Sequence, residues 1–222
     1  MEPAEDPAEA EFKTAVAEVA NEEEKKVILE AHGRIPEMRT LRDTAAWEGE
    51  EMVNGAVHHL TKVPGFAGVT RRFVQECDVS AEKFAGAMKD PTIRLKDKDA
   101  NVKEVEVKGE ISLGCILYYM RMKAGMMMDD RDFCQVLHTF KQSDGTFVVV
   151  DASVEHSSVP AVKKCVRGDM TQVFFVEPID EGNCRVTRVV RADPKGNVPN
   201  AMKGKVGKNN SIPKVLELAK AS

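Results

Sequence analysis

The sequence predicts an α+β domain in which a curved antiparallel sheet wraps around a long C-terminal α-helix and leaves room for a ligand. Three observations support this fold class: a helical pattern near the N-terminus, a long series of strand patterns after it, and a second helical pattern at the end. The 222 residues are 42% hydrophobic and 31% charged, which is ordinary for a globular chain. We expect acidic, proline-rich residues 1–10 to be disordered and residues 11–222 to form a single domain.

The N-terminal part predicts one interrupted helix and then two strands. Apolar residues follow helical spacing over residues 11–32, where Asn21 and Glu24 can form a capping box that restarts the helix. Gly33 ends the helix, and a polar link through Trp47 follows it. The next segments have strand patterns, at residues 56–63 and 68–79.

The middle of the chain predicts one short helix and a long antiparallel meander. Ser80 is placed to cap an amphipathic helix over residues 81–89. Turn residues at 143–145 (SDG) and 180–183 (DEGN) indicate two hairpins. The predicted strands cover residues 102–107, 111–123, 132–141, 145–154, 171–176 and 184–192.

The last element has helical apolar spacing over residues 198–219, but its composition is unfavourable for a helix. Gly204, Gly207 and Pro213 all weaken a helix at these positions. We therefore expect this helix to be stabilised by the surface on which it packs.

Charge and cysteine content exclude several classes of protein. A net charge of -4 argues against a nucleic-acid binder, which would carry a basic face. The five cysteines are widely spaced and form no CxxC pair, so we expect neither a disulfide framework nor a zinc site, and no cofactor. The N-terminus resembles neither a secretory signal nor a transit peptide, which favours a cytoplasmic protein.

Several short motifs, in order along the chain, resemble those of the START (StAR-related lipid transfer) domain family. They begin with Trp47 itself and continue with NVKEVEV (101–107), RDF (131–133), DG (144–145), SVEHSSVP (153–160), VRG (166–168), VEP (176–178) and RADPKGNVP (191–199). The resemblance covers roughly residues 46–221 and implies a helix-grip fold with a hydrophobic tunnel for one lipid. Tryptophans that are usual in the family are missing before NVKE and at Asn197, so an aromatic cage for a choline headgroup is poorly supplied.

The resemblance and the strand alternation together indicate which residues line the tunnel. Sterol-carrying relatives commonly have an acid and an arginine where this chain has Tyr118 and Leu137, which puts sterol specificity in doubt. The expected lipid-binding residues are Tyr118, Met120, Met122, Phe133, Gln135, Leu137, Val149, Arg188, Val190, Met202, Val206, Ile212 and Leu216.

Arg188 is the most specific candidate in this set. It shares the even-numbered, apolar face of the strand at 184–192, and a buried guanidinium needs a polar partner. That partner is a ligand group or an internal acid, unless the side chain extends to the rim. Asp151 is a candidate acid only if the family register holds, because the alternation over 145–154 predicts instead that Val148 and its even-numbered neighbours face inward.

Three consecutive methionines, Met126, Met127 and Met128, lie in the loop that the family places at the tunnel mouth. They are expected to form an adaptable apolar gate that contacts a membrane, or, alternatively, to fill the core. Burial of each is worth roughly 1.5–3 kcal/mol, which suits reversible attachment.

The predicted function is therefore intracellular binding and transfer of one lipid (a sterol, a phospholipid or a related molecule) by a monomeric, membrane-peripheral protein that is not an enzyme. Two alternatives stay open: a lipid-responsive interaction module, and a helix-grip enzyme such as a cyclase or hydrolase. The histidines and cysteines form no recognisable catalytic motif that would favour the enzyme.

Overall fold

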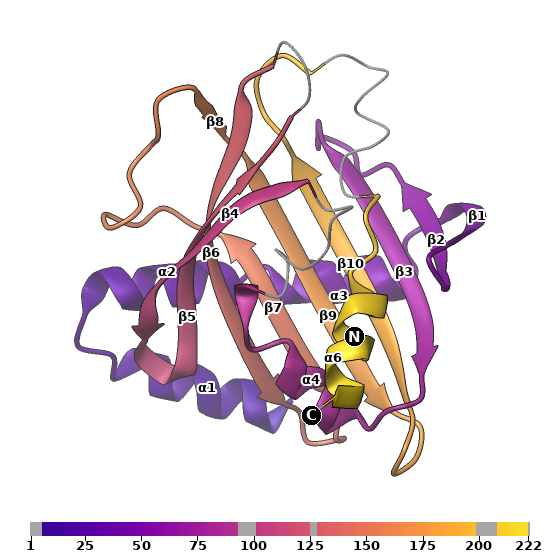
Figure 1. Cartoon of the computed structure of the whole chain (residues 1–222). Helices are drawn as coiled ribbons and strands as arrows, with labels where there is room; N and C mark the ends of the chain where they lie inside the picture. Colours follow the sequence, from indigo (N-terminus) through magenta and orange to yellow (C-terminus); the bar gives the residue numbers. More distant parts are fainter. Residues whose placement is uncertain (1–5, 93–100, 125–127, 199–207, 222) are drawn as a thin grey trace.

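A single ten-stranded sheet organises the part of the chain that the computed structural model describes, residues 6–92, 101–124, 128–198 and 208–221. The strand order is β1-β2-β3-β10-β9-β7-β6-β5-β4, and these neighbours are antiparallel, whereas β8 pairs in parallel with β6 (Figure 1). The strands are β1 (Glu48–Val53), β2 (Ala56–Thr61), β3 (Val69–Cys77), β4 (Val102–Ile111), β5 (Cys115–Met122), β6 (Asp130–Lys141), β7 (Phe147–Ser153), β8 (Cys165–Arg167), β9 (Asp169–Pro178) and β10 (Cys184–Asp193).

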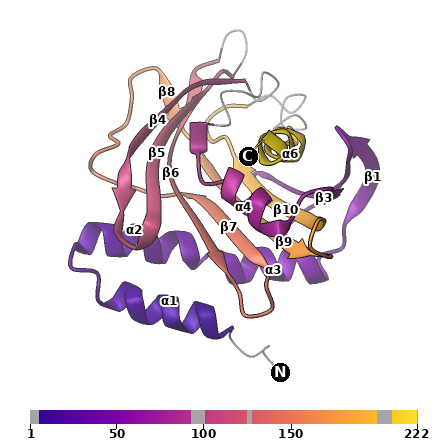
Figure 2. The ribbon, with the colours of Figure 1, turned by 60° about the horizontal axis from the view of Figure 1, so that its bottom comes forward.

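Helices cover both faces of the curved sheet. The outer face packs against α1 (Pro7–Ala17), α2 (Glu22–His32) and α3 (Ile35–Thr44). Helices α4 (Ala81–Ala87) and α6 (Ile212–Ala221) lie in the hollow on the inner side, where Figure 2 shows α6 end-on. The predicted fold class, α+β with a curved antiparallel sheet around a C-terminal helix, is confirmed.

The N-terminal helices differ in part from the prediction. Asn21 caps α2 as expected, because its Oδ1 accepts hydrogen bonds from the backbone N–H groups of Glu23 (3.0 Å) and Glu24 (3.2 Å). The expectation of disorder up to residue 10 is wrong for its last residues, since α1 begins at Pro7. Asp6 caps this helix by accepting from the Ala8 N–H at 2.9 Å, a local signal that the acidic composition concealed.

The polar link predicted between residues 33 and 55 contains α3 and β1. Pro36 suggests a break in the chain, but it occupies the first turn of α3, where a helix needs no backbone N–H donor. Ile35 and Met38 are buried by the outer face of the sheet, which stabilises this short helix. Strand β1 is exposed along most of its length, so it has no alternation of apolar residues that sequence analysis could detect.

The two faces of the sheet form two separate apolar clusters, which resolves the question of β7. Val149 belongs to the inner cluster, whereas Val148 and Val150 belong to the outer one. Asp151 lies on the inner face with Val149, so the family register holds and the assignment from alternation is wrong. Because helices cover both faces, the apolar side of a strand does not identify the inner side.

The C-terminal helix begins later than its apolar spacing predicts. Residues 208–211 are not helical, residues 199–207 lie outside the described part, and α6 starts at Ile212. The Asn210 Oδ1 accepts from the Ile212 N–H at 3.1 Å, and its Nδ2 donates to the Val53 carbonyl at 3.2 Å. Asn210 thus connects the start of α6 to the end of β1.

Candidate functional site

The inner face of the sheet brings together most of the residues predicted to bind a lipid. Nine of them belong to the inner cluster or pack against it: Tyr118, Met120, Met122, Phe133, Leu137, Val149, Val190, Ile212 and Leu216. The side chains come from β5, β6, β7, β10 and α6, because residues two apart on a strand share a face. Met202 and Val206 lie outside the described residues. Contact of these side chains with a ligand stays a prediction.

A buried polar chain crosses this apolar face. The Tyr118 hydroxyl donates to the Asp151 carboxylate, 2.8 Å from Oδ1 and 2.9 Å from Oδ2. The Gln172 Nε2 donates to the Asp151 Oδ2 at 2.9 Å, and the Arg188 Nε donates to the Gln172 Oε1 at 2.9 Å. None of these side chains is more than 6% exposed. This series of hydrogen bonds spans β5, β7, β9 and β10, and it holds a carboxylate and a guanidinium in an apolar environment.

Arg188 also reaches the C-terminal segment. Its Nη1 donates to the backbone carbonyl of Asn209 at 2.6 Å, and its guanidinium lies 5.2 Å from the ring centre of Phe73 and 5.6 Å from that of Phe174. The side chain is 6% exposed, so it does not extend to the rim. Arg188 is therefore connected to Asp151 through Gln172, and it fixes the backbone three residues before α6.

Gln135 differs from other inner-face polar residues with an unpartnered atom, such as Gln75 and Thr139, because both its donor and its acceptor lack partners among the described residues. It lies on β6 opposite Tyr118 and is 0% exposed. Neither its Nε2 nor its Oε1 has a hydrogen-bond partner among the described residues. A buried amide without partners is costly, so this side chain is suited to bind a polar group of a ligand.

Sequence analysis missed a second buried arginine on the inner face. Arg71 on β3 is 1% exposed, and its Nη1 lies 2.9 Å from the Nε2 of His58. The Nδ1 of His58 is 3.0 Å from the Oε1 of Glu51, which also pairs with Lys208 at 2.9 Å. Burial lowers the pKa of Arg71, and the Glu51 charge opposes this effect. Arg71 lies two positions before Phe73 on β3, so strand alternation could have placed both side chains on the same face.

The gate prediction can be followed for one of its three methionines. Met128 is partly buried at the start of the segment that leads into β6, whereas Met126 and Met127 lie outside the described residues. Gate function therefore stays a prediction.

A separate surface cavity of about 380 Å3 lies beside α3, on the outer side of the sheet. Its charged residues pair with one another: the Arg34 Nη1 lies 2.9 Å from the Asp169 Oδ1, and Arg191 pairs with Glu37. This self-neutralised polar cavity contains none of the predicted lipid-binding residues.

Comparison with known proteins places the chain in a family. The START domain model matches residues 46–216, and the chain belongs to the START domain family. Human StAR-related lipid transfer protein 5 superposes with a TM-score of 0.70 at 21% identity, covering 89% of this chain and 94% of its own. Human STARD10 superposes with a TM-score of 0.66 at 19% identity, and the match covers 84% of this chain and 79% of STARD10.

A bacterial structure is similar as well. The STAR-related lipid transfer protein of Xanthomonas axonopodis has a TM-score of 0.64 at 18% identity, covering 79% of this chain and 97% of its own. These likenesses establish the fold. No match was found among the curated proteins. Among the described residues, no helix is long and apolar enough to cross a membrane.

Proposed function

We propose that this protein binds one lipid between the inner face of the sheet and α6, and exchanges it at membranes. The START domain match and the structural neighbours named as lipid transfer proteins support this function. The observation that carries the proposal is the combination of an apolar inner face with the amide of Gln135, which has no hydrogen-bond partner in the described part of the chain. Apolar burial supplies affinity for the hydrocarbon part, and the amide supplies a contact for a hydroxyl or ester.

The polar residues divide into two roles in this proposal. Gln135 binds the polar group of the ligand, because neither its donor nor its acceptor is bonded to another described residue. Arg188 and Tyr118 border the same interior and select for a ligand whose polar group complements their charge and hydroxyl. The sterol-type pair of an acid and an arginine is replaced by Tyr118 and Leu137, so the polar contact differs from that of sterol-carrying relatives.

Lipid entry requires α6 to separate from the sheet. The helix buries Ile212, Val215 and Ala219 in the inner cluster, and two polar attachments hold its start. These are the Arg188 bond to the Asn209 carbonyl and the Asn210 bond to the Val53 carbonyl. A few hydrogen bonds, each contributing about 0.5–1.5 kcal/mol, form an attachment that can be broken and remade at a membrane. Met126, Met127 and Met128 supply the apolar contact with the bilayer in this mechanism.

The role is binding without turnover, at the cytoplasmic surface of membranes, by a monomer that binds no nucleic acid. The test is native mass spectrometry of the purified full chain after exposure to a mixed lipid extract, followed by extraction and identification of the bound molecule. A single unchanged lipid at one-to-one stoichiometry supports the proposal. An empty protein favours an interaction module, and a chemically altered lipid favours an enzyme.

Transfer is measured separately from binding. Protein loaded with a fluorescent analogue of the identified lipid is mixed with acceptor liposomes, and the rate of dequenching is recorded. Acceleration of transfer between two liposome populations supports a carrier. Binding without acceleration would instead indicate a lipid sensor.

A further inference from the structure

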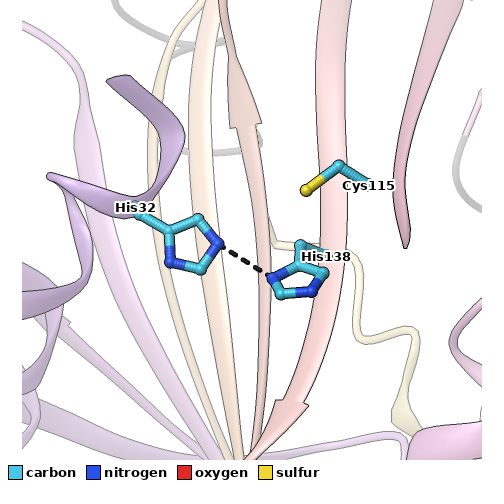
Figure 3. A group of neighbouring side chains, drawn as sticks. All are labelled: His32, Cys115 and His138. Atoms are coloured by element: carbon cyan, nitrogen blue, oxygen red, sulfur yellow. Dashed lines mark hydrogen bonds between the residues drawn. The ribbon is translucent and has the colours of Figure 1, made fainter. Parts of the chain in front are cut away.

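Two histidines and a cysteine gather on the outer face of the sheet, on the side opposite the proposed lipid site. Figure 3 shows His32, the last residue of α2, beside His138 of β6 and Cys115 of β5. Cys115 and His138 face each other on neighbouring strands, one position beyond the Ile116–Leu137 pair. The register of the sheet thus fixes two of these residues, and the end of α2 supplies the third.

The potential ligand atoms of the three side chains are already close together. The two imidazole nitrogens and the sulfur all lie within 4.8 Å of one another, and the His32 Nε2 is 2.9 Å from the His138 Nδ1. In a tetrahedral zinc site with Zn–N near 2.0–2.1 Å and Zn–S near 2.3 Å, the ligand atoms are separated by about 3.3–3.6 Å. Side-chain shifts of about 1 Å therefore convert this cluster into such a site.

The surroundings suit a bound metal ion. Cys115 is 0% and His138 is 8% exposed. The Phe12 ring stacks on His32 at 3.9 Å and on His138 at 4.9 Å between ring centres. An apolar shell of this kind controls access of solvent to a metal. His32 is only partly buried, which leaves a route of entry.

Burial also shifts the pKa of each of the three side chains. Burial lowers the pKa of His32 to about 3 and that of His138 to about 4, so both imidazoles are neutral near pH 7, which is the form that binds metals. Burial, together with the Glu110 charge, raises the pKa of the Cys115 thiol to about 12. Cys115 is therefore a thiol in the metal-free protein and must lose its proton when it binds an ion.

We propose that His32, His138 and Cys115 form a Zn²⁺ site that ties α2 to the sheet. Nitrogen and thiolate ligands favour Zn²⁺ over Mg²⁺ or Ca²⁺, and three protein ligands leave a fourth position for water. His32 precedes residues 46–216, the part that matches the START domain, so the N-terminal helices supply a ligand that the family region does not contain. The site is independent of the proposed lipid function.

Binding has a defined proton balance. The sulfur of Cys115 forms a bond with Zn²⁺ and its S–H proton goes to solvent. Each imidazole binds the ion through a nitrogen lone pair. In the metal-free protein, one of the two rings carries the N–H proton that lies between the His32 Nε2 and the His138 Nδ1. When the ion binds, that ring changes tautomer and carries the proton on its other nitrogen. Neither histidine loses its proton, so one proton is released for each ion bound.

The first experiment is calorimetric titration of the metal-stripped full chain with ZnCl2 near pH 7, in two buffers that differ in ionisation enthalpy. We expect one ion and one released proton per chain. Co²⁺ serves as the optical probe and should give thiolate charge-transfer absorption. A hundredfold excess of Zn²⁺ over its Kd should raise the Tm by about 5–10 °C.

Variants test whether the ion binds at these residues. Cys115→Ser and His32→Gln should each weaken Zn²⁺ binding by at least about tenfold, and Cys115→Ser should abolish the charge-transfer absorption. Cys134→Ser is the matched control, because Cys134 is 0% exposed in the same outer cluster but lies outside this group. Unfolding of each variant without metal separates loss of the site from loss of the fold.

Three results would overturn the proposal. The unmodified chain fails to bind Zn²⁺, or both Cys115→Ser and His32→Gln bind it with unchanged affinity, or Cys77→Ser abolishes binding while Cys115→Ser does not. The last result would place the ion at Cys77 and Cys184, which are paired on β3 and β10. In each case the two histidines and Phe12 would be an aromatic packing cluster.

Discussion

Replacing Gln135 with leucine should make the lipid-free protein more stable and its lipid binding weaker. Both polar atoms of this side chain are buried and lack partners among the described residues. An unsatisfied buried polar group costs about 1–3 kcal/mol, and leucine has a similar volume without such a group. Gln135→Leu should therefore raise the free energy of unfolding by about 1–3 kcal/mol. For a chain of this length, the Tm should rise by about 2–12 °C.

The same substitution should weaken lipid binding by about two- to thirteenfold, because one hydrogen bond contributes about 0.5–1.5 kcal/mol. Gln172→Leu is the matched control: Gln172 bonds both Asp151 and Arg188, so its loss should destabilise the lipid-free protein by about 2–5 kcal/mol. Urea unfolding of delipidated protein and titration with the identified lipid measure the two effects. A destabilised Gln135→Leu protein, or a stabilised one with unchanged lipid affinity, would refute the assignment of Gln135 to the ligand.

Three further predictions test other parts of the structure. Arg188→Leu should change which lipid is bound. It should also speed amide hydrogen exchange at the start of α6, because the hydrogen bond to the Asn209 carbonyl is lost. An unchanged lipid preference together with unchanged exchange would exclude both roles of Arg188. Serine at Met126, Met127 and Met128 should slow liposome transfer far more than it weakens equilibrium binding, and an unchanged transfer rate would reject the gate. Burial and the Arg71 charge lower the pKa of His58 below its usual value. Below about pH 6.5 the unfolded state therefore binds a proton at this histidine more readily than the folded state does. Stability is therefore lost as pH falls below that value, by up to about 1.4 kcal/mol per pH unit for one histidine. His58→Gln keeps an acceptor for Arg71 and should reduce the difference between denaturant unfolding at pH 7 and pH 5; an undiminished difference would show that His58 does not contribute.

Local patterns predicted much of the sheet and of the inner face. Strand alternation placed Arg188 with Val190, and the hairpin residues at 143–145 and 180–183 placed the turns between β6 and β7 and between β9 and β10. These features depend on neighbouring residues, which alternate between the two faces of a strand. Ser80 likewise caps α4 by accepting from the Lys83 N–H at 3.3 Å, as its position before an apolar stripe predicted.

Other elements had no local signal strong enough to detect them. Strand β1 is mostly exposed and depends on pairing with the neighbouring strand β2, whereas β8 has only three residues and depends on pairing with the distant strand β6. The C-terminal helix illustrates the opposite error, because apolar spacing extends before Ile212 while the Asn210 side chain caps the helix there. Spacing reports which residues are apolar, whereas hydrogen bonds decide where a helix begins.

The sequence by itself determined the α+β class, the positions of most strands along the chain, the family resemblance and the face of Arg188, because these follow from alternation, turn residues and motifs along the chain. Only the tertiary structure decided that Asp151 faces inward, that Gln172 connects it to Arg188, and that Gln135 is left without a partner in the described part. It also decided that His32 meets His138 and Cys115 across 106 and 83 positions of sequence. Hydrogen bonds and metal ligands depend on distances in space, and strand register with helix packing sets those distances.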